Sequence, residues 1–307
     1  MRTAFIKTLC QAAATDERIW LLTGDLGFSV LEAFRERFPD RYVNVGVAEQ
    51  NMTGVAAGLA SCGKVVFTYS IANFPTLRCL EQIRNDVCYH ALPVKVVSVG
   101  GGFAYGAQGY THHGVEDLAV MRSLPDMTVV APADPVETEL ATRMLIDTPG
   151  PCYLRLGKSR EPVVHTERPD YAIGRAIRMR EGKDATLIST GGMLQHTLGA
   201  AETLASKHGI QTRVLSMHTL KPLDAEAVRD AARQTRGVAT VEEHSVTGGL
   251  GSAVADVIAG MDEPHAPLHM YGAPDRLDPR VGSQAYLRGL AGDLVGTVRD
   301  LLGGTSA

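Results

Sequence analysis

The sequence has little cysteine, and its cysteines form no recognisable pattern. There are five, an odd number, and no two of them make a Cys-x-x-Cys pair. This argues against both a disulfide framework and the usual zinc-binding spacings. Free thiols in a reducing compartment fit this composition best, so we expect a cytoplasmic protein.

Long apolar segments and an excess of one charge are also missing. No apolar run approaches the length that spans a membrane, and the first residues lack the apolar core of a signal peptide. The net charge of −4 gives no electrostatic reason to expect binding to nucleic acid or to an anionic membrane. The 307 residues, 45% of them hydrophobic, are typical of a globular protein with about two domains.

What the sequence does contain is an alternation of short apolar, β-branched segments with helical patterns. In the first half, strands are predicted at 19–23, 64–69, 94–99, 128–131 and 152–156, and helices at 5–14, 52–61, 77–89, 116–124 and 135–146. In the second half, strands are predicted at 185–189, 212–216, 238–241 and 267–271, and helices at 194–207, 225–233, 251–258 and 285–302. Apolar strands separated by helices indicate parallel sheets covered on both faces. The predicted fold class is α/β, with two domains that each contain a mostly parallel sheet flanked by helices.

The alternation is interrupted between residues 157 and 184. Two prolines, three glycines and many charged residues fall in this stretch, which is typical of a linker. We therefore predict a first domain at 1–165, a linker at 166–183 and a second domain at 184–307.

One carboxylate stands in an unusual context. Glu49 follows a predicted strand and a glycine turn, and it precedes a helix of small residues between Gly54 and Ala60. An unpaired charge among close-packed apolar residues is costly. Glu49 is therefore expected either to be paired with a cation or to be held protonated for a chemical task.

Ligands of open parallel sheets bind beyond the carboxyl ends of the strands, which draws attention to the loops there. Asp25 follows the first strand, where a turn cap is favoured over a ligand contact. Phe74 either packs as a hydrophobic staple or forms an aromatic wall for a flat ring. Arg155 either binds a phosphate or carboxylate, or makes a salt bridge to the linker.

A glycine-rich loop at residues 100–114 carries two adjacent histidines, His112 and His113. Its glycine spacing matches neither a dinucleotide fingerprint nor a Walker A loop. Imidazoles in such a loop suit proton transfer or hydrogen bonding, although adjacent side chains point in different directions and at most one is expected in a site. Zinc is a poor interpretation, because no third ligand lies at a recognisable spacing.

Together these segments resemble the C-terminal part of transketolase-type, thiamine-diphosphate-dependent enzymes, namely the pyrimidine-binding domain plus the C-terminal domain, as in split transketolases. They are also similar to 1-deoxyxylulose-5-phosphate synthase and to the β subunit of 2-oxo-acid dehydrogenases. The matching segments are residues 24–27, 45–50, 109–113, 121–127, 131–134, 153–156, 221–224 and 242–251. The resemblance spans nearly the whole chain in order.

For the cofactor, the resemblance implies that Glu49 binds the ring nitrogen N1′ of thiamine diphosphate. That hydrogen bond makes the cofactor's own amino group basic enough to activate it. Phe74 is expected to stack on the aminopyrimidine, and Asp25 and Arg78 are expected to belong to the cofactor site.

For the substrate, the resemblance places His112 beside the reacting carbon, with His113 and Gln108 nearby, and gives Arg155 to the substrate phosphate. Gln108 stands where transketolases carry an acid, and Gly100 where they carry a second histidine. Both differences remove contacts to a ketose donor, and the oxo-acid dehydrogenase β subunits also carry Gln near this place.

The family's diphosphate-binding domain, with its Gly-Asp-Gly motif, has no counterpart in this chain. The resemblance therefore implies half an active site, completed by an N-terminal diphosphate-binding subunit that holds Mg²⁺ or Ca²⁺, in an expected α2β2 assembly. This chain itself is expected to bind no metal.

The leading hypothesis is a transferase of aldehyde or ketone groups that acts only with its partner. It would move a two-carbon ketol unit, or a related acyl carbanion, from a ketose or 2-oxo acid to an aldehyde. The alternatives are an E1 β subunit of a 2-oxo-acid dehydrogenase and a non-catalytic scaffold subunit.

Overall fold

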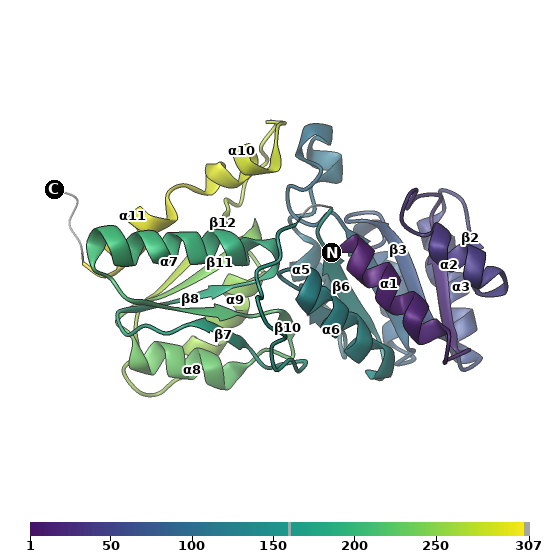
Figure 1. Ribbon diagram of the computed structural model, residues 1–307, viewed down its shortest axis with the longest axis horizontal. Helices are drawn as coiled ribbons and strands as arrows, with labels where there is room; N and C mark the ends of the chain where they lie inside the picture. Colours follow the sequence, from purple (N-terminus) through teal and green to yellow (C-terminus); the bar gives the residue numbers. More distant parts are fainter. Residues whose placement is uncertain (159–160, 304–307) are drawn as a thin grey trace.

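The chain folds into two α/β units placed side by side (Figure 1). The computed structural model describes residues 1–158 and 161–303. The first unit holds a seven-stranded sheet in the order β10-β5-β6-β4-β3-β1-β2, and the second holds a five-stranded sheet in the order β12-β11-β8-β9-β7. Both sheets are parallel except for one edge strand each, β10 and β7, so the predicted fold class is confirmed.

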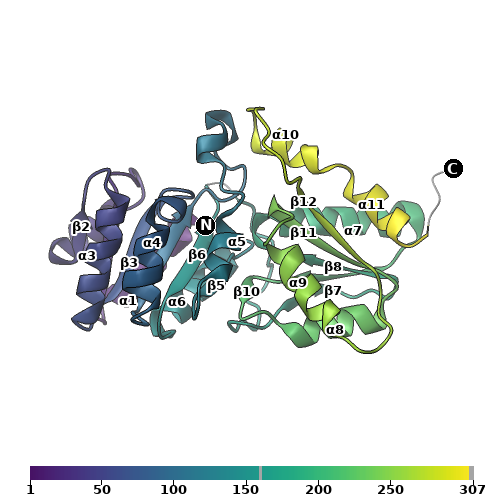
Figure 2. The ribbon, with the colours of Figure 1, turned by 180° about the vertical axis from the view of Figure 1, so that it is seen from behind.

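The first unit is a sheet between two helical layers. Its strands are β1 (Ile19–Thr23), β2 (Tyr42–Asn44), β3 (Val65–Ile71), β4 (Val94–Val99), β5 (Thr128–Val130) and β6 (Cys152–Leu156). Its helices are α1 (Arg2–Ala13), α2 (Glu32–Arg37), α3 (Glu49–Ser61), α4 (Leu80–Gln82), α5 (Asp117–Ser123) and α6 (Pro135–Asp147). Helices α1, α2 and α6 cover the face seen in Figure 1, and α3 and α4 cover the face seen in Figure 2.

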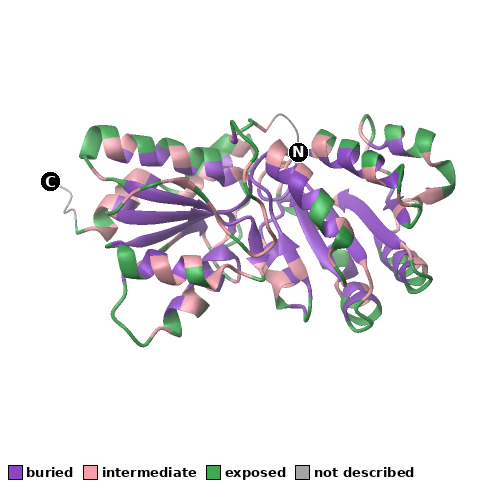
Figure 3. Cartoon of the chain, turned by 60° about the horizontal axis from the view of Figure 1, so that its bottom comes forward, coloured by how far each residue is buried: buried purple, intermediate pink, exposed green. Residues whose placement is uncertain are grey.

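The second unit repeats this layered plan. The strands of its sheet are β7 (Ile177–Arg180), β8 (Ala185–Ser189), β9 (Thr212–Ser216), β11 (Val238–Ser245) and β12 (Leu268–Ala273). Strand β10 (Thr219–Lys221) follows β9 in the chain but lies in the sheet of the first unit. The helices of the second unit are α7 (Leu194–His208), α8 (Ala225–Gln234), α9 (Leu250–Ala259), α10 (Gln284–Arg288) and α11 (Leu294–Leu301). Figure 3 shows the central strands buried along their length while the outer helix faces are exposed, as expected for sheets covered on both sides.

Two predicted helices differ from the structure, and three short elements were not predicted. The predicted helix 285–302 is wrong: it is two helices, because Gly292 has a φ of 98° and Asp293 caps a new helix by accepting from the backbone N–H groups of Val295 and Gly296. The predicted helix 77–89 is a 3₁₀ turn, a short α-helix and a π-helix at Ile83–Cys88. The sequence reasoning also missed α2, β7 and β10, which are all short.

The two units are joined by more than the chain between them. Strand β10 belongs to the second half of the sequence but pairs antiparallel with β5 of the first sheet. At the same junction, the Glu137 carboxylate accepts hydrogen bonds from His165 Nε2 (2.8 Å) and Ser216 Oγ (2.7 Å). Strand β7 lies within the stretch assigned to a linker. The second unit is therefore anchored to the sheet that carries the predicted site.

Among residues 1–158 and 161–303, no helix combines the length and the apolar character that crossing a membrane requires.

Candidate active site

Glu49 is the first residue of α3, and its side chain is only 1% exposed. Its Oε2 accepts a hydrogen bond of 2.6 Å from Arg78 Nη1, and its Oε1 accepts a longer one of 3.3 Å from Ser70 Oγ. The α3 N-terminus adds a favourable field for a negative charge. Of the two states considered for Glu49, the structure shows the paired one.

Three further side chains, those of Arg78, Phe74 and His112, lie in successive contact beginning at the Glu49 carboxylate. The Arg78 guanidinium carbon lies 4.6 Å from the centre of the Phe74 ring. The Phe74 ring meets the His112 ring edge-on, with 5.3 Å between centroids. Glu49, Arg78, Phe74 and His112 thus form a continuous row that we call the Glu49 row. Its members come from α3, the segment after β3 and the loop after β4, so the sheet brings together residues that are 63 positions apart in the sequence.

The two adjacent histidines face different surroundings. The half-buried His112 carries its Nδ1 3.0 Å from Thr111 Oγ1, which leaves Nε2 for a ligand. His113 is buried, its Nε2 lies 3.2 Å from the carbonyl oxygen of Gly106, and its ring packs on Phe103. His112 is therefore the histidine that joins the Glu49 row, whereas His113 supports the loop.

Gln108 and Asp25 lie at the periphery of this region. Gln108 ends a 3₁₀ turn in the same loop as His112 and is exposed. Asp25 is exposed, has a φ of 57°, and exchanges two hydrogen bonds with the Asn44 side chain, at 3.0 and 2.9 Å. These are the bonds of a local turn, and a cofactor contact of Asp25 stays a prediction.

Arg155 is an interior residue. Its side chain is 7% exposed, and its Nε donates to Asp117 Oδ2 at 2.9 Å. Its Nη2 donates to the carbonyl oxygens of Gly114 (2.5 Å) and Glu243 (3.0 Å). The salt bridge considered from the sequence exists, but its partner lies on α5 rather than in the linker. A role of Arg155 in binding substrate phosphate stays a prediction.

Lys158 is a cation that the sequence reasoning did not select for this site. It is exposed at the end of the segment after β6, and its Nζ lies 4.7 Å from the centre of the Tyr105 ring. The Tyr105 ring in turn lies 6.4 Å from that of His112. Lys158 therefore extends the Glu49 row at the end away from Glu49. Lys158 follows Arg155 by three positions in the sequence, which could have drawn attention to it. The direction of its side chain is known only from its contact with the Tyr105 ring.

Two buried side chains of β11, Glu242 and His244, have pKa values shifted from their ordinary values. Burial raises the pKa of Glu242 to about 7, even though its carboxylate accepts hydrogen bonds from the backbone N–H groups of Gly251 and Leu250. Burial lowers the pKa of His244 to about 4, so this histidine is neutral at physiological pH. Its Nδ1 donates to the Ser245 carbonyl oxygen and its Nε2 accepts from the Ala119 N–H.

The Glu242 pKa predicts a pH dependence of stability. Its folded pKa of about 7 exceeds the ordinary value of 4.5, so the folded state binds the proton more tightly. Its contribution to stability is therefore present below pH 4.5 and is lost as the pH rises to about 7, by up to roughly 3 kcal/mol. We expect wild type to lose stability relative to Glu242→Gln between pH 5 and pH 8. The measurement is the melting temperature of both proteins at the two pH values. A difference that does not change with pH would contradict this assignment.

Comparison with known proteins agrees with the geometry. Residues 1–162 match the transketolase pyrimidine binding domain, and residues 174–292 match the transketolase C-terminal domain. The chain belongs to the transketolase family. It is 40% identical over 276 residues to one subunit of the apulose-4-phosphate transketolase of Phocaeicola vulgatus, covering 89% of this chain and 87% of that subunit.

Two further relatives match this chain over nearly their whole length. The 6-deoxy-6-sulfo-D-fructose transketolase subunit SqwH of Clostridium sp. is 39% identical over 94% of this chain and 88% of its own length. Among solved structures, a split gene transketolase described as an inactive beta4 tetramer superposes with a TM-score of 0.88 at 39% identity, covering 99% of this chain and 98% of the other. Membership of this family implies dependence on thiamine diphosphate, and similarity to subunits of transketolases implies a partner subunit.

The residues of this chain fit one end of thiamine diphosphate. A buried carboxylate and an aromatic ring, Glu49 and Phe74, are the groups that a flat, nitrogen-bearing ring requires. For the diphosphate end, residues 1–158 and 161–303 contain no cluster of three or more histidine, cysteine or acidic side chains that could hold a metal ion.

Proposed function

We propose that this chain is the pyrimidine-domain subunit of a two-component transketolase, and that it transfers a two-carbon ketol unit, or a related acyl carbanion, from a ketose or 2-oxo acid to an aldehyde. The observation that carries the proposal is the Glu49 row, found in a chain that matches split transketolase subunits along nearly its whole length. A scaffold subunit would not need to keep a buried carboxylate, an aromatic face and an imidazole in one row.

Each member of the row has a task in this proposal. Thiamine diphosphate, when bound, would supply the thiazolium ring that takes up the electron pair released when the donor's carbon–carbon bond breaks. Glu49 holds the aminopyrimidine by a hydrogen bond. Its Oε1 has capacity for one because, among the residues that the structure describes, it accepts only the long bond from Ser70. Phe74 orients the ring, and His112 Nε2 holds or moves a proton at the donor's oxygen.

The partner subunit is proposed to bind the diphosphate through Mg²⁺ or Ca²⁺ in an α2β2 heterotetramer. Two observations support a partner on this side of the first unit. Phe28 and Val47, in loops beyond the carboxyl ends of the strands, are 76% and 77% exposed. Gly54 and Gly58 lie on an open side of α3, where an added Cβ would meet nothing within 4 Å, so another helix can approach closely.

Four of the five free thiols are buried, which is compatible with the cytoplasmic location we propose.

The decisive test is a tagged pull-down from the native host, followed by titration of thiamine diphosphate with and without the co-purified chain. We expect a partner of the diphosphate-binding type, and tight Mg²⁺-dependent binding only in the mixture. Transfer to an aldehyde rather than to a lipoyl group would separate a transketolase from a 2-oxo-acid dehydrogenase. Tight binding by this chain alone, or a partner that turns over fully without it, would contradict the proposal.

Lys158, and not Arg155, is expected to bind the phosphate of a phosphorylated donor. Lys158 is exposed at the end of the Glu49 row, whereas three donor contacts of Arg155 go to interior groups. We expect Lys158→Ala to raise the KM of a phosphorylated donor by about tenfold or more, because it removes a charge-assisted contact, and to change the KM of its unphosphorylated analogue little. Steady-state kinetics with both donors checks this. An unchanged KM for the phosphorylated donor in Lys158→Ala would return the role to Arg155.

A further inference from the structure

The loop that carries Gln108 and His112 leaves the first unit after β4 and lies against the second unit. Its two stems meet in a backbone bridge: Gly102 N–H donates to the Gly114 carbonyl oxygen at 2.7 Å, and Gly114 N–H donates back at 2.9 Å. Between these stems, residues 103–113 form only short 3₁₀ turns. The position of His112 therefore depends on how the stems are held.

Both stems are connected to a single residue of the second unit, Glu243 on β11. Its Oε1 accepts a hydrogen bond of 2.8 Å from the backbone N–H of Phe103, at the first stem. Its backbone carbonyl oxygen accepts from Arg155 Nη2, and the same nitrogen donates to the Gly114 carbonyl oxygen at the second stem. The two stems are thus joined through one residue that lies 140 positions from Phe103 in the sequence.

Close packing accompanies these bonds. Gly102 has a φ of 66°, and a Cβ at this position would approach Glu243 Cγ to 2.5 Å, so only glycine lets the carboxylate reach the loop. The Glu243 side chain is 6% exposed. Its charge is balanced by α10: Arg288 donates to Oε2 from Nε (2.9 Å) and Nη2 (2.5 Å), and Gln284 Nε2 donates to both oxygens. Buried charge-assisted bonds of this kind fix geometry well.

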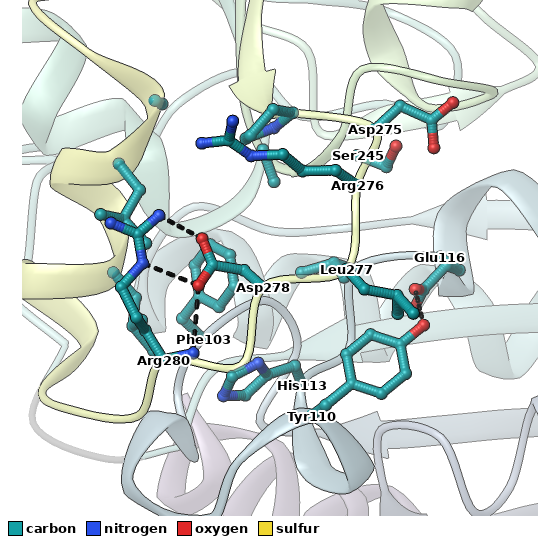
Figure 4. A pocket seen from close by; sticks show the side chains of 16 residues that line it. Phe103, Tyr110, His113, Glu116, Ser245, Asp275, Arg276, Leu277, Asp278 and Arg280 are labelled. Carbon is teal, nitrogen blue, oxygen red and sulfur yellow. Dashed lines mark hydrogen bonds and ion pairs between the residues drawn. The ribbon is translucent and has the colours of Figure 1, made fainter.

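On its other side, the same loop borders a cavity of about 180 Å³ between the two units. Figure 4 shows Phe103, Tyr110 and His113 of the loop on one wall, and Leu277, Asp278 and Arg280 of the segment after β12 on the other. None of the side chains that the structure describes fills this space, so packing on this side restrains the loop weakly. The carboxylate of Glu243 is therefore the side-chain restraint on the Phe103 stem, beside the Gly102–Gly114 backbone bridge and the Gly282 N–H that donates to the Gly106 carbonyl oxygen at 3.3 Å.

We infer that Glu243 is a positioning residue for the transfer reaction, which holds the Gln108–His112 loop in the arrangement that recognises the donor. This inference rests on the proposed function. Glu243 does not touch the Glu49 row, so its effect is expected on the donor and not on the cofactor. The second unit thereby takes part in donor recognition without contributing a group to the reacting atoms.

The test compares wild type, Glu243→Ala and Glu243→Gln in the reconstituted two-subunit enzyme, with Glu202→Ala as a control that loses a carboxylate from an exposed ion pair with Arg180. We expect Glu243→Ala to raise the donor KM by about ten- to hundredfold, because a small displacement of a binding group has effects of this size. Thiamine diphosphate affinity is expected to change less than about threefold, whereas kcat is expected to fall together with the rise in donor KM, because the displaced loop also carries His112. Glu243→Gln is expected to show a smaller rise in donor KM, because its amide oxygen still accepts from Phe103.

A second readout needs no activity. Hydrogen–deuterium exchange of this chain is expected to accelerate in residues 103–113 of both Glu243 variants, with β4 and β11 unchanged and Glu202→Ala like wild type. An unchanged donor KM with unchanged loop exchange would overturn the inference, as would a uniform acceleration across the chain with weaker cofactor binding. If Glu243→Ala does not fold, the same two measurements on Glu243→Gln decide. Absence of transfer by the wild-type mixture would instead count against the proposed function, while the exchange result still tests the loop restraint.

Discussion

Glu49→Ala is expected to lower the turnover of the two-subunit enzyme by a factor of about 10³ or more, because in the proposed function its carboxyl group activates the cofactor. The fold is expected to survive. The side chain that pairs with Glu49, Arg78, is 44% exposed, so its charge remains solvated when the carboxylate is gone. The measurement is kcat of the reconstituted enzyme, together with the melting temperature of the isolated chain.

The matched control is Glu17→Ala, which removes an exposed carboxylate at the amino end of β1, opposite the end where the site lies. It is expected to leave kcat unchanged. Near-normal turnover of Glu49→Ala would refute the proposed role of Glu49 in binding the cofactor. It would also refute the proposal that the Glu49 row is the active site. A large loss of kcat that accompanies an unfolded chain would show instead that the carboxylate acts mainly on stability.

The second large effect concerns stability rather than turnover. Asp117→Asn is expected to lower the free energy of unfolding by roughly 3–5 kcal/mol, since it leaves the buried guanidinium of Arg155 without its counter-ion. Asp117 is fully buried, and its Oδ2 accepts from Arg155 Nε and from the Tyr153 hydroxyl at 2.5 Å. Both bonds hold β6 to α5. Urea unfolding followed by circular dichroism measures the loss.

Asp170→Asn provides the comparison for this variant. It breaks the ion pair with Arg175, in which both side chains are more than half exposed. Exposed pairs contribute about 0–1 kcal/mol, so this control is expected to unfold like wild type. A loss in Asp117→Asn no larger than that of the control would mean that Arg155 is not held by Asp117. The free guanidinium would then be available for a substrate phosphate, as the family resemblance implied.

The central strands were predictable because local composition decides them. Strands β1, β4 and β6 have the bounds expected from the sequence, since a strand buried on both faces is rich in apolar and β-branched residues even where it carries a buried charged side chain, such as Lys95 in β4 or Arg155 in β6. Strands β7 and β10 were not predictable. Each is an antiparallel edge strand of three or four residues, and its conformation comes from the neighbouring strand rather than from its own composition.

The candidate site was singled out from the sequence only in part, and the roles of its residues stay predictions. The sequence singled out Glu49, Phe74 and His112, because their motifs are local and because parallel strands bring their carboxyl-end loops to one edge. It did not show that Arg78 pairs with Glu49, that Lys158 extends the row, or that Arg155 faces the interior. Each of these depends on the direction of a side chain, which is set by its neighbours in space.

Composition and pattern thus determined the layered α/β architecture, the family resemblance and the residue types available for catalysis. Only the tertiary structure shows how the second unit contacts the first, through the pairing of β10 with β5 and the contact of Glu243 with the loop after β4. The physical reason is the range of the interactions. Hydrophobic periodicity is a property of neighbouring residues, whereas a hydrogen bond across 140 residues forms only when the packing of both units has already fixed its donor and acceptor.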